Sequence, residues 1–296
     1  MFVNILGNEK NKTILEKSIN SNKTSHSYIF WGIEGIGKKM IAKEFAKNLL
    51  CLGKQENCNC KSCIEFKSNN NPDFQLIEPD EGKIKIEQIR EMQRRISEKP
   101  IISNKKIYII DNSDTMTTEA QNCLLKTLEE PPEYATIILI CTNEDNLLST
   151  IKSRCTSIHI ESIDTEEIKK YIKQNYSDQE ISENIINLSQ GSIGKLIKLN
   201  ENKSLYENIE KILLNMQNKD LIEILQMSEE IYKAKEEISS VLEYMNVILL
   251  KLSNKNIKYI RCVEIVEQTK KRLKANSNYD MCIDNLLFNM TFIIHN

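Results

Sequence analysis

The chain has 296 residues, of which 40% are hydrophobic and 28% are charged, and its formal net charge is −2. This length allows two or three domains, and the near-neutral charge argues against a dedicated nucleic-acid binder. No run of residues approaches the ~18 apolar residues of a membrane span, and residues 1–8 do not resemble a signal peptide. The sequence therefore predicts a soluble cytoplasmic protein with no membrane partner.

A glycine-rich turn connects the first apolar strand to the helix that follows it. A helix is expected over residues 11–21 and a strand over residues 28–31, ahead of Gly32-Ile33-Glu34-Gly35-Ile36-Gly37-Lys38. This segment satisfies G-x-x-x-x-G-K, a loop in which backbone N–H groups cradle phosphates and the lysine supplies a positive charge. Apolar residues then recur every four positions, which predicts a helix whose N-terminus favours an anion. The candidate phosphate-binding residues are Gly32, Gly35, Gly37 and Lys38.

The residue after this lysine departs from the pattern of ATP-hydrolysing proteins. Those proteins carry Ser or Thr there, because the hydroxyl binds Mg²⁺, whereas this chain carries Lys39. A protonated ammonium cannot be a metal ligand. The substitution argues against hydrolysis at this loop and leaves binding of ATP without hydrolysis open, with Lys39 and Asp111 among the candidate nucleotide-binding residues.

Four of the nine cysteines follow the first helix within thirteen residues, with the spacing C-x6-C-x-C-x2-C. Four thiolates so close together suit a tetrahedral Zn²⁺ that keeps no open position for water. The sequence therefore predicts a structural rather than a catalytic zinc site. Its ligands would be Cys51, Cys58, Cys60 and Cys63.

A buried strand further along ends in an acidic residue. A strand is expected over residues 73–77, a helix over residues 83–99, and a second strand over residues 107–111. Asp111 stands where a phosphate-loop protein supports Mg²⁺ with an aspartate. Many such ATPases place a glutamate next, which polarises the attacking water, but this chain has Asn112, whose amide is not basic. The metal-binding hydroxyl and the general base are thus both missing.

Three arginines of the expected helix over residues 83–99 lie away from its apolar stripe: Arg90, Arg94 and Arg95. Contacts with phosphates would explain this arrangement, and so would a solvated basic face. The sequence leaves both explanations open.

The next elements complete an α/β sheet. A helix is expected from Thr117 to the prolines at 131–132, a strand over residues 136–143, a short helix over residues 147–153 and a last strand over residues 157–160. Asn143, at the polar end of its strand, is a further candidate for nucleotide binding. Five strands that alternate with helices predict a mainly parallel sheet with helices on both faces.

Beyond residue 161 the sequence pattern is helical only. Helices are expected over residues 166–174 and 178–188, after the turn at residues 191–195, and from about residue 205 to the end. Their apolar stripes are typical of a helical core or of helix–helix contacts. No cluster of catalytic residue types accompanies these stripes.

Several motifs, in this order and spacing, resemble the clamp-loader branch of the AAA+ proteins. They are Ser25-His26-Ser27-Tyr28, the four-cysteine insert, Leu124-Leu125-Lys126-Thr127-Leu128-Glu129-Glu130-Pro131-Pro132, and Ser153-Arg154-Cys155. The resemblance implies a RecA-like AAA+ domain over residues 1–161 with a zinc insert at 51–63. It further implies a small helical lid over residues 162–202 and an all-α collar domain for oligomerisation over residues 203–296.

Within this branch, the ATP-hydrolysing gamma/tau subunit differs at three positions. It has Ser or Thr in place of Lys39, Glu in place of Asn112 and Arg in place of Gly194. The resemblance thus implies a subunit without ATP turnover of its own. In the family, the arginine of Ser-Arg-Cys reaches the ATP site of a neighbouring subunit, so Arg154 is the expected catalytic residue in trans.

The resemblance also implies partners. These are the gamma/tau and delta clamp-loader subunits and, through the complex, the sliding clamp and primer–template DNA. The chain would then work in the cytoplasm, at the nucleoid-associated replisome, as part of a DNA-directed DNA polymerase holoenzyme.

Two other functions stay open from the residues. A gamma/tau-like motor would bind and hydrolyse ATP with Mg²⁺ held by Asp111. The presence of Lys39 and Asn112 argues against this function. A zinc-dependent DNA-binding protein would use the cysteine cluster and the three arginines. The net charge argues against this function.

Overall fold

The structure is a computed structural model that describes residues 1–3, 5–53, 58–176 and 181–295. The chain forms two compact units. The first comprises Met1–Lys169 and Gly191–Gly194, and the second comprises Lys170–Gln190 and Lys195–Asn296. Residues 54–57 of the expected zinc insert and residues 178–180 of an expected helix lie outside the described residues.

The first unit is built on a parallel five-stranded sheet with the order β2-β3-β4-β1-β5. Its strands are β1 (Ser27–Trp31), β2 (Phe74–Ile77), β3 (Lys106–Ile110), β4 (Ala135–Cys141) and β5 (Thr156–His159). Its helices are α1 (Glu9–Asn20), α2 (Lys38–Leu50), α3 (Lys61–Lys67), α4 (Ile86–Ile96), α5 (Thr118–Glu129) and α6 (Ser149–Lys152), with 3₁₀ turns η1 (Ser113–Thr115) and η2 (Glu144–Asn146). The predicted parallel α/β sheet is confirmed.

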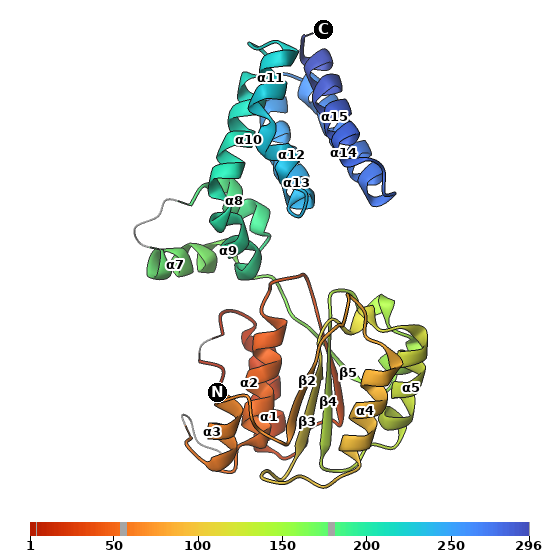
Figure 1. Ribbon diagram of the computed structural model, residues 1–296. Helices are drawn as coiled ribbons and strands as arrows, with labels where there is room; N and C mark the ends of the chain where they lie inside the picture. The colour runs from red at the N-terminus through yellow and green to blue at the C-terminus, as the bar shows by residue number, and fades with distance from the viewer. Residues whose placement is uncertain (4, 54–57, 177–180, 296) are drawn as a thin grey trace. The chain divides into compact units, whose positions relative to one another are not determined.

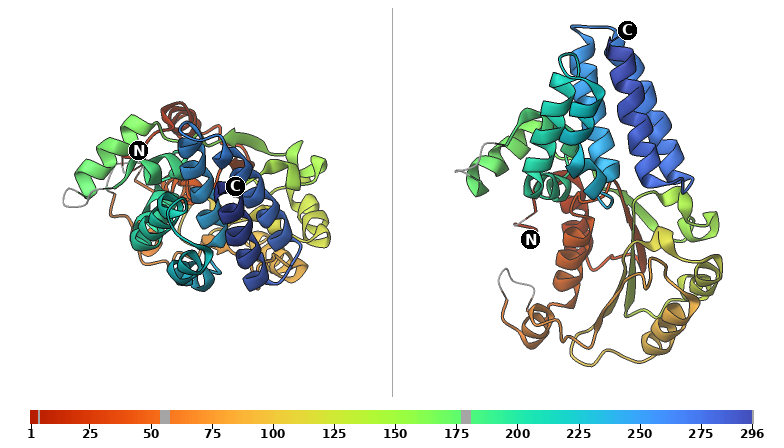
Figure 2. Two further views of the ribbon diagram at one scale, coloured as in Figure 1. Left: turned by 90° about the horizontal axis from the view of Figure 1, so that it is seen from above. Right: turned by 45° about the horizontal axis from the view of Figure 1, so that its top comes forward.

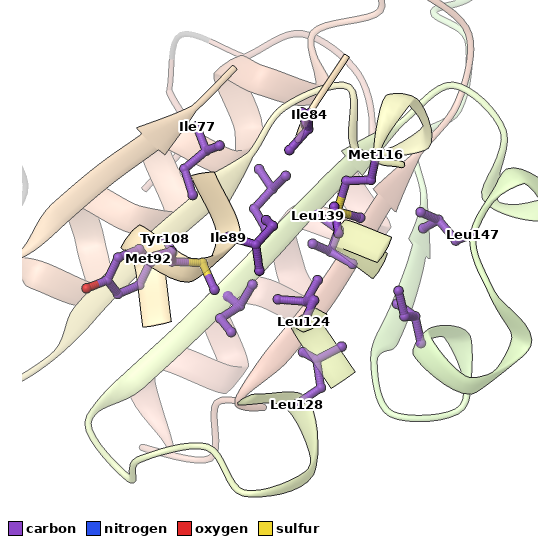
Figure 3. Close-up of a cluster of buried hydrophobic side chains, with 14 of the residues drawn as sticks. Ile77, Ile84, Ile89, Met92, Tyr108, Met116, Leu124, Leu128, Leu139 and Leu147 are labelled. Atoms are coloured by element: carbon purple, nitrogen blue, oxygen red, sulfur yellow. The ribbon is translucent and has the colours of Figure 1, made fainter. Parts of the chain in front are cut away.

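Helices cover both faces of this sheet, as predicted. Helices α1 and α2 lie on one face, and α4 and α5 lie on the other (Figure 1). Figure 3 shows the cluster on the second face, where Ile89 and Met92 of α4 and Leu124 of α5 pack with Leu139 of β4. Every residue of β3 and β4 is buried. Since both faces are covered, polar side chains of functional importance can gather only where the strands end.

Two element boundaries differ from the predictions for a local reason. The helix expected over residues 83–99 is limited to α4, because Ile84 N donates to Thr115 O and so joins a short bridge instead of the helix. Strand β2 begins after Asp73 rather than at it. The Asp73 side chain is buried, and its carboxylate accepts hydrogen bonds from Ile101 N at 2.6 Å, Ile102 N at 2.7 Å and Ser103 N at 2.6 Å.

The loop over residues 101–103 is also bonded to α3, the helix that carries one of the clustered cysteines. The hydroxyls of Ser62 and Ser103 are 2.8 Å apart, and Asn71 Nδ2 donates to Ser62 O at 2.9 Å. All three side chains are buried. Asp73 and this polar network thus fix the end of the cysteine insert to the sheet.

The second unit is helical. The helices from residue 165 onward are α7 (Thr165–Asn175), α8 (Glu183–Ser189), α9 (Ile193–Glu201), α10 (Lys203–Asn215), α11 (Leu221–Met227), α12 (Glu229–Lys233), α13 (Ile238–Ser253), α14 (Lys258–Lys274) and α15 (Tyr279–His295). Of the helix expected over residues 178–188, the described part is α8, which begins at Glu183 because Ser182 Oγ accepts from Ile185 N and caps it. Helices α14 and α15 lie side by side (Figure 2). The boundary between lid and collar stays a prediction.

The core of the second unit includes a pair of buried tyrosines. Tyr206 of α10 and Tyr244 of α13 pack edge to face with ring centroids 5.0 Å apart. Tyr244 Oη donates to Glu210 Oε2 at 2.9 Å, which satisfies its hydroxyl. Within the described residues, no helix has both the length and the hydropathy needed to cross a membrane.

Replacement of Asp73 by alanine should destabilise the first unit. The substitution leaves three backbone N–H groups without their charged acceptor, and the one of Ser103 is buried, so we expect a loss of about 2–4 kcal/mol in the free energy of unfolding. Chemical denaturation followed by circular dichroism measures it. The control is Asp145→Ala, whose exposed carboxylate pairs with Lys152 and should change stability by less than about 1 kcal/mol. Equal midpoints for the two variants would contradict the role of Asp73.

Candidate functional site

The glycine-rich loop lies between β1 and α2, at the carboxyl edge of the sheet. Gly37 is the residue before α2, and its φ of 98° lies in the left-handed region, which favours glycine. Gly35 also has a positive φ of 73°. The predicted order of strand, glycine-rich turn and helix is therefore present, and helix α2 begins at Lys38 as the pattern requires.

Lys38 is bound to the loop itself. Its ammonium donates to Gly32 O at 2.6 Å and to Ile33 O at 2.8 Å. The side chain is buried, and burial lowers the pKa of Lys38, although nearby acidic groups, Asp111 among them, act in the opposite direction. The ammonium that contacts phosphates in this motif is thus hydrogen-bonded to carbonyl oxygens of the same loop.

Lys39 forms two ion pairs with side chains at the ends of neighbouring strands. Its ammonium is 2.5 Å from Glu78 Oε1 and 3.0 Å from Asp111 Oδ2. Burial acts to lower the pKa of Lys39, but the hydrogen bonds and negative charges of Glu78 and Asp111 outweigh it and raise the pKa. Sequence reasoning missed Glu78. Its position directly after β2 was the available signal, because parallel strands bring their carboxyl ends to one edge.

A later segment of the first unit packs against the loop. Gly194 N donates to Gly35 O at 3.0 Å, and Ser192 Oγ donates to Glu34 O at 2.9 Å. A Cβ atom on Gly194 would lie 2.9 Å from both Cα and O of Gly35. Such a distance forces the backbone to shift, so this position has no room for any side chain, let alone the arginine of the gamma/tau pattern.

Asn112 and Asn143, also at this edge of the sheet, have local roles. Asn112 follows β3 in a left-handed conformation, with φ of 47°, and its side chain is exposed. Asn143 Oδ1 accepts from Asp145 N at 2.9 Å, which caps the turn η2. The structure therefore brings Lys38, Lys39 and Asp111 together at the loop, and it places Asn143 as a turn cap.

The residues around the loop do not fit a magnesium-bound nucleotide as they stand. Asp111, the expected support of Mg²⁺, is paired with Lys39, and the Lys38 ammonium is engaged by two loop carbonyls. A magnesium ion would have to displace an ammonium from its own carboxylates. We therefore derive no catalytic step through Mg²⁺ in this chain.

The four clustered cysteines do fit a structural zinc ion. Their sulfur atoms all lie within 4.8 Å of one another. Burial acts to raise the pKa of Cys60, but backbone N–H groups and neighbouring thiols lower it to about 6, which favours the thiolate that metals bind. The four ligands would be Cys51 at the end of α2, Cys58, Cys60 and Cys63 of α3. A bound zinc would tie the end of α2 to α3.

Arg154 lies between α6 and β5, and residues of two other sequence motifs contact it. Its Nη2 is 2.8 Å from Glu129 Oε1, and its Nη1 donates to Thr150 O at 2.9 Å. The buried Ser27 hydroxyl donates to the Arg154 carbonyl oxygen at 2.8 Å. Sequence reasoning did not connect Ser27 and Glu129 with Arg154, although all three belong to the motifs that carry the resemblance.

The arginines of α4 mostly pair within their own helix. Arg94 pairs with Glu91, and Arg95 Nε is 2.8 Å from Glu91 Oε1. These contacts favour a solvated face over a phosphate-binding one, since one carboxylate already offsets part of their charge.

Comparisons with known proteins identify the family to which the chain is similar. The sequence profile of the family described as DNA polymerase III, delta subunit, matches residues 7–164. The chain is 34% identical over 205 residues to DNA polymerase III subunit delta' of Bacillus subtilis, which covers 68% of this chain and 61% of that protein. It is 35% identical over 173 residues to subunit tau/gamma of Haemophilus influenzae, which covers 58% of this chain and 25% of that protein.

A solved structure shares the fold. It is a DNA polymerase III gamma-subunit-related protein from Thermotoga maritima, with a TM-score of 0.53 and 19% identity over 95% of this chain and 99% of the other. This similarity, together with the parallel five-stranded sheet and the helical second unit, supports the predicted fold class. At this identity the likeness establishes the fold alone.

The cysteine cluster predicts about one zinc ion per chain in protein purified without chelators. Elemental analysis of the purified chain measures it. Cys63→Ser removes a buried ligand and should abolish most of the bound zinc, whereas the matched change Cys123→Ser, outside the cluster, should leave the zinc content unchanged. A metal-free wild-type chain would refute the site.

Proposed function

The chain belongs to the DNA polymerase III delta subunit family, and from this membership we propose that it is the delta-prime subunit of a bacterial clamp loader. In this role it hydrolyses no ATP of its own. It donates Arg154 to the ATP site of a neighbouring subunit and takes part in loading the sliding clamp on primed DNA.

The ion pair between Lys39 and Asp111 is the observation that carries the first part of the proposal. Hydrolysis in phosphate-loop proteins needs a hydroxyl after the loop lysine, an aspartate free to support Mg²⁺ and a group that positions water. Here the hydroxyl is replaced by an ammonium, the aspartate is paired with it, and Asn112 takes the place of the base. Three requirements fail together.

The position of Arg154 supports the second part. The residue lies next to β5, which is one of the two edge strands of the described sheet, and about a third of its side chain is exposed (34%). A guanidinium carries a permanent charge and five donors in a fork that matches phosphate oxygens. Placed on the γ-phosphate of a neighbour, it would stabilise the charge of the transition state.

Glu129 and Ser27 would position Arg154 before it contacts a phosphate. The pair with Glu129 is partly exposed on both sides, and such ion pairs contribute little net stability. A phosphate with more than one negative charge can therefore replace Glu129 at small cost. The hydrogen bond from Ser27 to the Arg154 carbonyl holds the backbone, so only the side chain has to move.

The proposal includes partners and a location. The chain would assemble with the gamma/tau and delta subunits, and through them with the clamp and primer–template DNA, at the replisome in the cytoplasm. The zinc site would be structural and would take no part in the chemistry.

A gamma/tau-like motor is the second candidate. The intact Gly35, Gly37 and Lys38 favour it, as does the 35% identity to a tau/gamma subunit. The contacts of Lys38 and Lys39 within the chain oppose it.

Removal of the Arg154 side chain should impair ATP hydrolysis in the assembled clamp loader. We expect Arg154→Ala to lower turnover at the facing ATP site about 10³-fold, and Arg154→Lys to recover little of it, because lysine lacks the planar fork. Single-turnover hydrolysis in the reconstituted complex measures this. The control is Lys152→Ala, which removes a cation two residues before Arg154, at the end of α6. Unchanged hydrolysis in assembled Arg154→Ala would remove the assignment.

The isolated chain should release no phosphate from ATP in the presence of Mg²⁺. Phosphate release is followed on one sample of the wild type and one of Lys38→Ala, and both should match the rate without protein. Steady turnover that Lys38→Ala abolishes would establish the motor instead.

A further inference from the structure

We propose that the Lys39 ammonium is a built-in cation that takes the position of the metal ion in this phosphate loop. The loop would then be stable in its observed shape without metal or nucleotide. This inference rests on the proposed function only in that both require a loop without hydrolysis, and it can be tested on the isolated chain.

The register of the sheet places two carboxylates side by side. Ile77 of β2 is paired with Ile110 of β3, and Asp111 N donates to Ile77 O at 2.9 Å. Glu78 and Asp111, the next residues of the two strands, therefore leave the sheet at the same level. Two negative charges this close repel each other, and the Asp111 side chain is only 13% exposed, so water screens its charge poorly.

Lys39 supplies the positive charge that these two carboxylates require. It is the second residue of α2, directly after the loop lysine, and its ammonium contacts an oxygen of each carboxylate. In phosphate-loop proteins the residue at this position offers a hydroxyl to a metal ion that an aspartate also supports. In this chain one side chain replaces both the hydroxyl and the cation.

The rest of the loop is also satisfied from within the chain. The Lys38 ammonium binds the carbonyls of Gly32 and Ile33, and Gly194 N binds the carbonyl of Gly35. Loops of this kind can bind an anion through their backbone N–H groups. Here the Lys38 ammonium and the Gly194 N–H bind three carbonyls of the loop, and Lys39 binds the strand ends beside it, so none of these contacts requires a ligand.

Lys39 could instead be an additional cation for nucleotide phosphates. In that arrangement the ammonium would have to leave Glu78 and Asp111, and the two carboxylates would then face each other and the phosphates without the cation that pairs with both. That loss of two ion pairs opposes binding of an anion, and the built-in cation is therefore the arrangement that the geometry favours.

Replacement of Lys39 by threonine should convert the position into a divalent-cation site. The variant offers a hydroxyl and two carboxylates, which are the oxygen ligands that Mg²⁺ and Mn²⁺ prefer. We expect Lys39→Thr to bind about one Mn²⁺ per chain in electron paramagnetic resonance titrations without nucleotide, and to gain thermal stability from Mg²⁺. The wild type should show neither effect.

Two further variants make the result specific. Lys39→Arg keeps a cation and should behave like the wild type, and Lys39→Thr combined with Asp111→Asn should lose the acquired Mn²⁺ site. Lys39→Gln, which removes the charge at similar length, replaces Lys39→Thr if circular dichroism shows that the threonine variant does not fold. In that variant the two carboxylates alone should bind Mn²⁺.

Two outcomes would overturn the inference. One is the absence of bound Mn²⁺ in folded variants without a cation at position 39, and the other is a wild-type Mn²⁺ site that Asp111→Asn removes. These outcomes are distinct from failure of the proposed function, which is decided by Arg154→Ala in the assembled complex.

Discussion

The pairing of Lys39 with Glu78 and Asp111 is the interaction on which the arrangement around the glycine-rich loop depends. A parallel sheet buried on both faces leaves no place for polar chemistry except its strand ends, and the register of β2 and β3 brings two carboxylates to one level there. Without a cation between them, the carboxylates of Glu78 and Asp111 at the ends of the two strands would repel each other. With it, strand ends, loop and helix form one electrostatically balanced edge.

The opposite end of the module depends on a different buried charge. Asp73 binds three consecutive backbone N–H groups of the loop before β3, and Ser62, Asn71 and Ser103 extend this network to α3. The end of the cysteine insert is therefore anchored to the sheet by hydrogen bonds that involve none of the four cysteines. A zinc ion held by those cysteines would add a second link, between α2 and α3.

Local patterns were enough to predict the architecture, but not the contacts that decide the site. The apolar runs of β3 and β4, the repeat in α2 and the cysteine spacing can all be read from short segments. The contact between Gly194 and Gly35 joins segments far apart in the sequence, so no local pattern contains it. Sequence reasoning missed Glu78 because its contact with Lys39 depends on how β2 and β3 are paired. Helix α4 begins later than predicted because Ile84 forms a bridge with a residue distant in the sequence.

The contact of Gly194 with the loop also has an evolutionary consequence. Because the backbone of residue 194 lies against Gly35, an arginine would fit there only if the whole segment were displaced. A hydroxyl residue at position 39 alone would supply a possible metal ligand without supplying that arginine. A change of this loop toward the gamma/tau pattern would thus need several mutually dependent substitutions, which is a form of epistasis.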